Sequence, residues 1–195
     1  MIRIGVIGGI GSGKSFVAKL FNSPVFNADR EVNILYKSSR ECFKKLNKKI
    51  PKFIKSFPVS KSQLIKAINQ DKKNLQKISS VVHPLVRKKL RFFLKKYKKR
   101  KMVILDIPLL IENRLYNKGD VLIYVKSKQN KIVSRLRKRK NYNKKILMNL
   151  KKNQANLLKK RKLANYIVDN NLSPVMMKKK ISFLKKKIFY ERNCS

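Results

Sequence analysis

A short glycine-rich segment near the start of the chain limits which folds the rest can adopt. Residues 8–15, GGIGSGKS, match the pattern G-x-x-x-x-G-K-[ST] at every fixed position. The β-prone run IRIGVI at 2–7 precedes them, and SFVAKLF at 15–21 follows with apolar residues at helical spacing. Glycines let successive backbone N–H groups converge on one phosphate, and the following helix directs its N-terminus at the same anion. Strand, loop and helix in this order predict a site for a nucleoside triphosphate.

The chemistry of such a loop assigns roles to its residues. Lys14 can reach the β- and γ-phosphates, and the Ser15 hydroxyl can coordinate Mg²⁺. Asp106 closes the apolar run VILD, where an acidic side chain would share the metal. The loop is common to small-molecule kinases, ATPases and GTPases, so it does not by itself select among them. The predicted nucleotide-binding residues are Gly9, Ile10, Gly11, Ser12, Gly13, Lys14 and Ser15, and the predicted metal ligands are Ser15 and Asp106.

Hydrophobic patterns place further strands and helices in alternation along the chain. A helix is expected after the second strand, with Asp29 as a possible N-cap, and a very basic helical stretch at 127–163. A closing helix carries Pro174 in its first turn. The alternation predicts an α/β fold with a parallel central sheet covered on both faces. The further strands are expected at 24–28, 101–108, 120–126 and 165–171.

One long segment of the chain carries no strand pattern. Residues 39–100 are predicted to be mostly helical, with breaks near Pro51, Pro58 and Pro84. We expect this segment, and the basic segment around 134–152, to be insertions beside the active edge of the sheet.

Charge is the unusual feature of the composition. Lys and Arg number 52 against nine Asp and Glu, which gives a net charge of +43. Two interpretations stay open: solvated helix faces, which usually account for charge runs, and a dedicated surface for polyanions. The aromatic motifs of RNA-binding modules are absent from the sequence. Because of the high positive charge, non-specific binding of polyanions is kept as an alternative.

The remaining composition favours an intracellular protein. The chain has two cysteines, no CxxC motif and one histidine, which suits a reducing compartment and excludes a multi-histidine metal site. No apolar run is long enough to span a membrane, and no signal peptide pattern is present. We expect a cytoplasmic protein without membrane insertion and without an obligate protein partner.

Beyond the loop, several segments together resemble one enzyme family. They are GGIGSGKS at 8–15, NAD at 27–29, HPLV at 83–86, LDIPLLIEN at 105–113, RLRKR at 135–139 and ANYIVDNN at 164–171. In order and spacing they look like the motifs of dephospho-CoA kinases, and the resemblance covers nearly the whole chain. Each segment alone would be weaker; PLLIE together with the loop and HP is highly specific.

The resemblance implies a reaction and an architecture. The reaction is transfer of the ATP γ-phosphoryl group to the ribose 3′-hydroxyl of dephospho-CoA, the final step of coenzyme A synthesis, with Mg²⁺. The architecture is a single P-loop kinase domain, a three-layer sandwich with a parallel central sheet, a helical substrate domain and a lid. The expected ranges are a core at about 1–38, 101–133 and 153–195, a substrate-binding insertion at about 39–100 and a lid at about 134–152.

The resemblance also implies residue roles. Asp29 matches the catalytic aspartate, expected to accept or orient the proton of the acceptor hydroxyl, and a helix N-cap is the competing interpretation. Lys14 and Arg139 complete the predicted catalytic set. Arg135 and Arg139 match paired lid arginines that contact phosphate. The predicted substrate-binding residues are His83, Pro108, Leu109 and Glu112.

Four positions depart from the family pattern in ways that bear on activity. Asn27 stands where the family usually has aspartate, and Asn33 where it often has histidine or arginine. Ile132 replaces a usual glutamine, and Asn165 a usual aspartate.

The competing functions are another nucleoside or nucleotide kinase, and a polyanion-binding protein that uses ATP as a switch.

Overall fold

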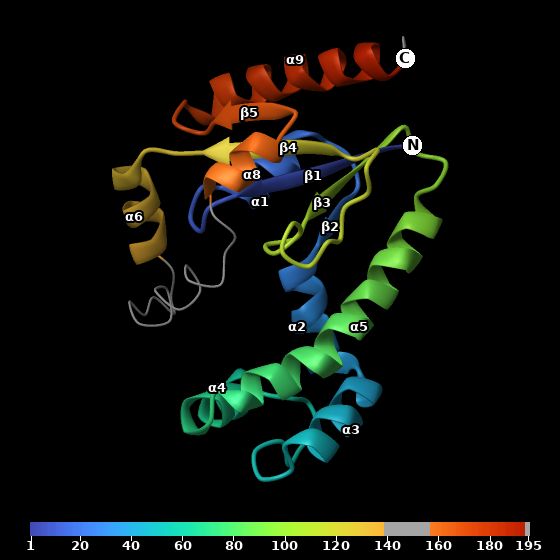
Figure 1. The fold of residues 1–195 in the computed structure, drawn as a ribbon, viewed down its shortest axis with the longest axis vertical. Coiled ribbons are helices and arrows are strands. Elements are labelled where there is room, and N and C mark those ends of the chain that lie inside the picture. The colour runs from blue at the N-terminus through green and yellow to red at the C-terminus, as the bar shows by residue number, and fades with distance from the viewer. Residues whose placement is uncertain (139–156, 194–195) are drawn as a thin grey trace. The chain divides into compact units, whose positions relative to one another are not determined.

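The computed structural model describes residues 1–138 and 157–193, which form two compact units (Figure 1). The first unit comprises Met1–Asn27 and Tyr97–Ser195, and the second Ala28–Lys96. No helix among the described residues is long and apolar enough to cross a membrane. In this division the second, helical unit begins at Ala28, the residue that directly follows the second strand, and not near residue 39.

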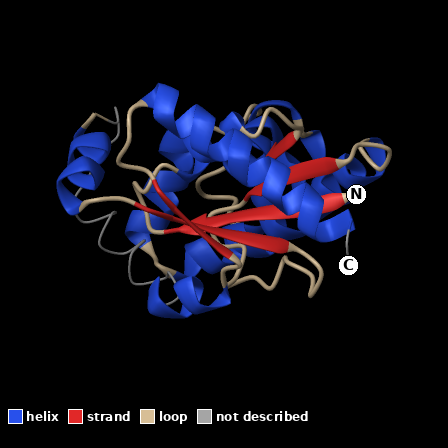
Figure 2. Ribbon diagram, turned by 90° about the horizontal axis from the view of Figure 1, so that it is seen from above, coloured by secondary structure: helices blue, strands red, loops and turns tan. Residues whose placement is uncertain are grey.

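The first unit is built on a sheet of five parallel strands. Their order across the sheet is β2-β3-β1-β4-β5, seen as one twisted layer in Figure 2. Because β1 lies at the centre, its carboxyl end, from which the glycine-rich loop leaves, has a neighbouring strand on each side. The strands are β1 (Ile2–Gly8), β2 (Val25–Asn27), β3 (Met102–Asp106), β4 (Val121–Lys126) and β5 (Tyr166–Asp169).

Helices pack against this sheet and close its core. Side chains from α1 (Lys14–Leu20) and α9 (Pro174–Asn193) join one buried cluster with β1, β3, β4 and β5. Among its members are Phe21 and Ile181, both fully buried. Two further helices are α6 (Gln129–Arg137) and α8 (Leu157–Leu163). The predicted α/β fold with a parallel central sheet is confirmed.

The second unit is entirely helical in its regular structure. Ser39 caps α3 by accepting a hydrogen bond from the backbone of Cys42, and Ser60 with Gln63 forms a capping box on α4. These caps satisfy backbone donors that would otherwise lack partners. The helices are α2 (Ala28–Ser38), α3 (Arg40–Lys49), α4 (Lys61–Gln70) and α5 (Lys73–Lys96).

The expected break near Pro84 is wrong, because Pro84 lies inside α5. Proline removes one hydrogen bond of the helix and normally kinks or ends it. In α5 the buried face continues through this point, and Val81, Val82, Leu85 and Val86 all pack into the helical unit. Burial of these side chains on both sides of the proline offsets the missing bond, since each fully buried aliphatic side chain contributes about 1.5–3 kcal/mol.

Two expectations at helix ends have different outcomes. Asp29 is not an N-cap, since α2 already begins at Ala28 and Asp29 lies within its first turn. Pro174 does begin α9, in the first turn where proline costs no hydrogen bond. The basic stretch contains α6 and α8, and residues 139–156 between them, which include most of the expected lid, lie outside the described residues.

Candidate active site

The glycine-rich loop joins β1 to α1, as the sequence predicts. Gly8 ends the strand with φ 143°, and a Cβ atom there would lie 2.5 Å from the carbonyl oxygen of Val125. Gly13 precedes α1 with φ 91°, a backbone conformation that side chains with a Cβ rarely adopt. Glycine at these two positions therefore lets the loop pass close to β4 and enter α1 in a left-handed backbone conformation.

Lys14 lies across this loop. Its Nζ donates to the carbonyl oxygens of Gly8 at 3.2 Å and Gly9 at 2.9 Å. The side chain is half-buried, and the neighbouring Ser15 is exposed at the start of α1. An ammonium group and a hydroxyl group, both of which can bind or help to bind phosphate, thus belong to this loop and the start of α1.

An acidic side chain ends the strand next to β1. Asp106 is the last residue of β3 and is only 3% exposed. In the parallel register Asn27 is its partner on β2, and the Asn27 Nδ2 donates to the Asp106 Oδ2 at 2.5 Å. Asn27 is one of the departures from the family pattern, and here its amide supplies a donor to the carboxylate. A second carboxylate at this place would repel the first.

The oxygen donors of Ser15 and Asp106 fit a magnesium ion. Mg²⁺ prefers oxygen ligands and is usually held by one or two carboxylates together with phosphate oxygens of the substrate. A hydroxyl from the first turn of α1 and a carboxylate from the end of β3 meet this requirement. Within the described residues no group of three or more His, Cys, Asp or Glu side chains could hold a metal.

Arg135 contacts the back of the loop. Its Nη1 lies 3.2 Å from the Ser12 carbonyl oxygen and 2.8 Å from the Ser127 Oγ. The Nη2 donates to the Asn170 carbonyl oxygen at 2.9 Å. Its predicted contact with phosphate stays a prediction, and Arg139, the second predicted lid arginine, lies outside the described residues. The sequence predicts no role for Ser127, which lies in no motif, or for Asn170, which lies in the segment ANYIVDNN.

Glu112 forms an ion pair that the sequence does not predict. Its Oε1 lies 2.7 Å from the Nζ of Lys160 on α8, and the two side chains are 15% and 1% exposed. A lysine is almost never buried this deeply unless it is paired. The pair ties the segment after β3 to α8 within the first unit, and a contact of Glu112 with substrate stays a prediction.

We expect Glu112→Gln to lower the free energy of unfolding by about 3–5 kcal/mol, since it leaves the Lys160 ammonium buried without its counter-charge. Urea denaturation followed by circular dichroism measures the change. Lys126→Ala is the control, because the Lys126–Asp169 pair at 3.5 Å is exposed and contributes about 1 kcal/mol or less. Equal effects of the two substitutions would contradict the assigned role of the buried pair.

The segment after β3 also carries two other predicted substrate residues. Pro108 and Leu109 are both half-buried, in the turn that follows Asp106. The next residue, Leu110, is buried, and a Cβ atom on Gly5 would lie 2.5 Å from its Cδ2. Leu110 thus fills the space that Gly5 leaves beside β1 and anchors the turn to the sheet.

Two other departures from the family pattern have local structural roles. Ile132 of α6 packs against the loop, where a Cβ atom on Gly11 would lie 2.9 Å from its Cγ2. Asn165 pairs with Leu122 before β5 begins: its Oδ1 accepts from the Leu122 backbone at 2.8 Å, and its own N–H donates to the Leu122 carbonyl at 2.9 Å. Nothing in the structure explains Asn33.

Two predicted residues belong to the helical unit. Asp29 is exposed in the first turn of α2, two residues after β2 ends. His83 lies on the solvent-exposed side of α5. Partial desolvation of its imidazole, and to a smaller extent the positive charge of Arg87, lower the pKa of that imidazole. Since the pKa is below its ordinary value, His83 is mostly neutral at pH 7 and offers one donor and one acceptor.

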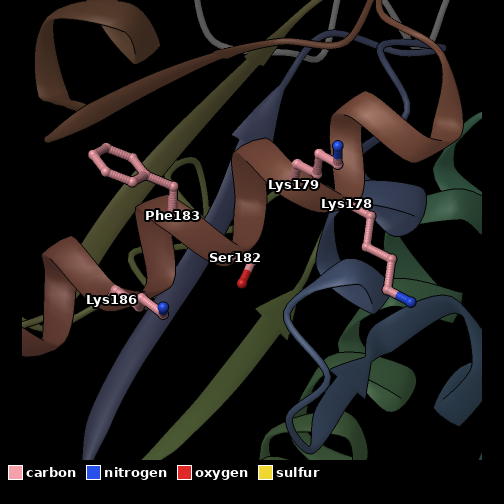
Figure 3. Close-up of a pocket in the computed structure, with 5 residues that line it drawn as sticks. All are labelled: Lys178, Lys179, Ser182, Phe183 and Lys186. Carbon is pink, nitrogen blue, oxygen red and sulfur yellow. The ribbon is translucent and has the colours of Figure 1, made fainter.

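A separate pocket lies on α9, away from the loop residues. Lys178, Lys179, Ser182, Phe183 and Lys186 line it, and Figure 3 shows these side chains along the one helix. Phe183 is 72% exposed. None of the predicted site residues lines this pocket, so it is a basic surface feature and not the nucleotide site.

The loop, its lysine and the acid at the end of the adjacent strand, carried on a parallel sheet, define the class of P-loop nucleotide-binding proteins. The model of the dephospho-CoA kinase family matches residues 2–175. The chain belongs to the dephospho-CoA kinase family, whose members catalyse the final step of coenzyme A biosynthesis.

Similar proteins agree with this assignment. The dephospho-CoA kinase of Wolbachia pipientis wMel is 34% identical over 175 residues, which cover 87% of this chain and 89% of the relative. That of Ehrlichia canis (strain Jake) is 31% identical over 199 residues, covering 99% and 97%. The solved dephospho-CoA kinase from Campylobacter jejuni shares the fold with a TM-score of 0.67 at 19% identity, covering 95% of this chain and 96% of that one.

Proposed function

We propose that this chain transfers the γ-phosphoryl group of ATP to the ribose 3′-hydroxyl of dephospho-CoA through the site built on the loop after β1. The observation that carries the proposal is the arrangement of Lys14 and Ser15 on this loop, with the Asp106 carboxylate at the end of the neighbouring strand. The loop holds the triphosphate, and the acceptor alcohol attacks the γ-phosphorus in line with the leaving ADP oxygen.

Each residue has a distinct role in the proposed transfer. Backbone N–H groups from Gly9 to Ser15 bind the phosphates, and Lys14 leaves its carbonyl acceptors to bind the β- and γ-oxygens. Asp29 accepts the proton of the 3′-hydroxyl as the oxygen attacks. Its support is the motif match and its exposure two residues past the end of β2.

Ser15 and Asp106 are the residues that would hold Mg²⁺. The ion, when bound, would offset the negative charge of the phosphates. The amide of Asn27 holds one Asp106 oxygen at 2.5 Å and so fixes how the carboxylate is oriented. His83, Pro108, Leu109 and Glu112 are proposed to contact dephospho-CoA, and Arg139 the transferring phosphoryl group. We further propose that the enzyme acts in the cytoplasm.

Acceptor specificity tests the proposal against another nucleoside or nucleotide kinase. With ATP and Mg²⁺, we expect phosphorylation of dephospho-CoA and much slower phosphorylation of adenosine, AMP and shikimate. Mass spectrometry of the products measures each rate. A digest that cleaves the pyrophosphate of the product should release adenosine 3′,5′-bisphosphate, which places the new group on the 3′-oxygen. Faster turnover of a nucleoside or nucleotide than of dephospho-CoA would overturn the assignment.

A second, weaker activity is proposed for the basic surface. Three lysines of α9 and the exposed Phe183 line the pocket of Figure 3, and the chain carries a net charge of +43. Lysines beside an exposed aromatic ring suit the phosphates and bases of single-stranded nucleic acid. We propose that this face binds polyanions electrostatically and without sequence preference.

We expect the affinity for a single-stranded oligonucleotide to fall linearly on a logarithmic scale as salt rises, because bound phosphates release counterions. Fluorescence anisotropy measures the slope. Combined substitution of Lys178, Lys179 and Lys186 by alanine should reduce its magnitude by about 2. Affinity that is independent of salt, or that depends on sequence, would contradict purely electrostatic binding.

A further inference from the structure

Three side chains converge on one carbonyl oxygen at the back of the phosphate-binding loop. The acceptor is the Ser12 oxygen. Asn170 Nδ2 donates to it at 2.9 Å, Arg135 Nη1 lies 3.2 Å away, and Ser127 Oγ also lies 3.2 Å away. The three come from different places in the chain: the start of the segment after β4, helix α6 and the turn after β5. We call Ser127, Arg135 and Asn170 the loop clamp.

The members of the loop clamp also hold one another. Arg135 Nη1 donates to Ser127 Oγ at 2.8 Å, and Arg135 Nη2 donates to the Asn170 carbonyl oxygen at 2.9 Å. The backbone N–H of Asn170 donates to the Lys126 carbonyl oxygen at 2.9 Å, which fixes Asn170 to the end of β4. A guanidinium group with its donors directed at several acceptors in this way is held in one orientation.

The loop fits closely around the clamp. Asn170 is 2% exposed, and a Cβ atom on Gly13 would lie 2.1 Å from its Nδ2. Gly13 itself has φ 91°. Any side chain at residue 13 would therefore displace the Asn170 amide as well as strain the backbone. The glycine of the motif serves the contact with Asn170 in addition to the approach of phosphate.

The clamp determines the direction of one N–H group. In a trans peptide the carbonyl of one residue and the N–H of the next point in opposite directions. Donors that hold the Ser12 carbonyl on the clamp side thus direct the N–H of Gly13 away from the clamp. This is the N–H at the entrance to α1, where the helix N-terminus attracts an anion.

We propose that Ser127, Arg135 and Asn170 are positioning residues for the triphosphate, and that Arg135 acts through the loop rather than by touching phosphate. The inference rests on the proposed binding of ATP at this loop. It reassigns Arg135, whose motif predicts a phosphate contact, and it adds Ser127 and Asn170, for which the sequence predicts no role. It also couples the loop to α6, the helix that leads into the expected lid.

The test compares Asn170→Ala, Ser127→Ala and Arg135→Ala with Arg137→Ala, an exposed arginine two residues along α6. Isothermal titration calorimetry gives the Kd of ATP, and steady-state kinetics give the KM of each substrate. We expect Asn170→Ala and Arg135→Ala each to raise the Kd of ATP about tenfold and Ser127→Ala to raise it about threefold. In these three variants the KM of dephospho-CoA should change less than about twofold. In Arg137→Ala the Kd of ATP should also change less than about twofold.

The double variant and a conservative variant separate positioning from a direct contact. Because the loop is released only once, Asn170→Ala with Arg135→Ala should raise the Kd by less than the product of the single effects. Arg135→Lys should not restore binding, since one ammonium group cannot reach the acceptors that the guanidinium spans. Ser127→Ala removes a single hydroxyl, so it reports on the loop even if a larger truncation lowers stability.

The inference is overturned if Arg135→Ala lowers kcat with the Kd of ATP unchanged, while Asn170→Ala and Ser127→Ala bind ATP like the wild type. That pattern would assign Arg135 to the phosphoryl group itself. Fully multiplicative effects in the double variant would also overturn it. Calorimetry with ATP needs no acceptor, so a wild type that binds ATP and forms no coenzyme A would refute the proposed reaction alone.

Discussion

Lys14→Ala should abolish measurable transfer, with kcat/KM reduced about 10²–10³-fold or more. The Lys14 ammonium lies across the loop on the Gly8 and Gly9 carbonyls, and this loop is proposed to bind the triphosphate. Its removal takes away the one charged side chain of the loop, which is proposed to offset the developing negative charge. Coupled-assay kinetics measure the loss, and circular dichroism checks that the fold persists.

Lys19→Ala is the matched control for this prediction. Lys19 is an exposed lysine on the same helix, in its last turn. The Lys19→Ala substitution removes the same charge from the chain without changing the loop, so activity should stay within about twofold of the wild type. If Lys14→Ala kept more than half of the activity, the loop would not be the phosphoryl-transfer site.

Asp29→Asn should lower kcat about 10²–10⁴-fold and leave the Kd of ATP nearly unchanged. The amide keeps the shape and hydrogen-bonding reach of the carboxylate but cannot accept the proton of the attacking hydroxyl. Rapid-quench kinetics with saturating ATP and dephospho-CoA measure the chemical step directly. Glu31→Gln, which neutralises the other acid in the first turn of α2, is the control.

A structural role for Asp29 predicts a different result. Since α2 begins at Ala28, Asp29 lies in the first turn, where a carboxylate also interacts favourably with the helix dipole. If that were its whole contribution, Asp29→Asn would lower the thermal stability by a small amount and leave kcat within about twofold. That outcome would remove Asp29 from the catalytic set.

The parts of the fold that the sequence predicts are those with local patterns. Residues 2–7, the loop and the helix after Lys14 each follow from spacing within a few residues, and the structure has β1, the loop and α1 there. The same holds for β3 and β4, whose apolar runs are continuous because both faces of a parallel sheet are covered. Helix α5 continues through Pro84 because helix packing outweighs a local breaker.

The contacts that the sequence could not predict join distant residues of ordinary type. Lys160 is one of 52 basic residues, and only the fold shows that it is buried against Glu112. Asn170 reaches Ser12 across a separation of 158 residues. Periodicity carries no information about such pairs, because it reports which face of an element is buried and not what that face meets.

The most direct measurement of the central claim is a single turnover with ATP labelled at the γ-phosphate. Enzyme in excess is mixed with labelled ATP, Mg²⁺ and dephospho-CoA, and the products are separated by chromatography. We predict that the label moves into coenzyme A in the wild type and stays in ATP with Lys14→Ala. Recovery of the label as inorganic phosphate would contradict transfer to dephospho-CoA. Recovery of the label in ATP would also contradict it, provided that the wild-type enzyme is folded and binds ATP.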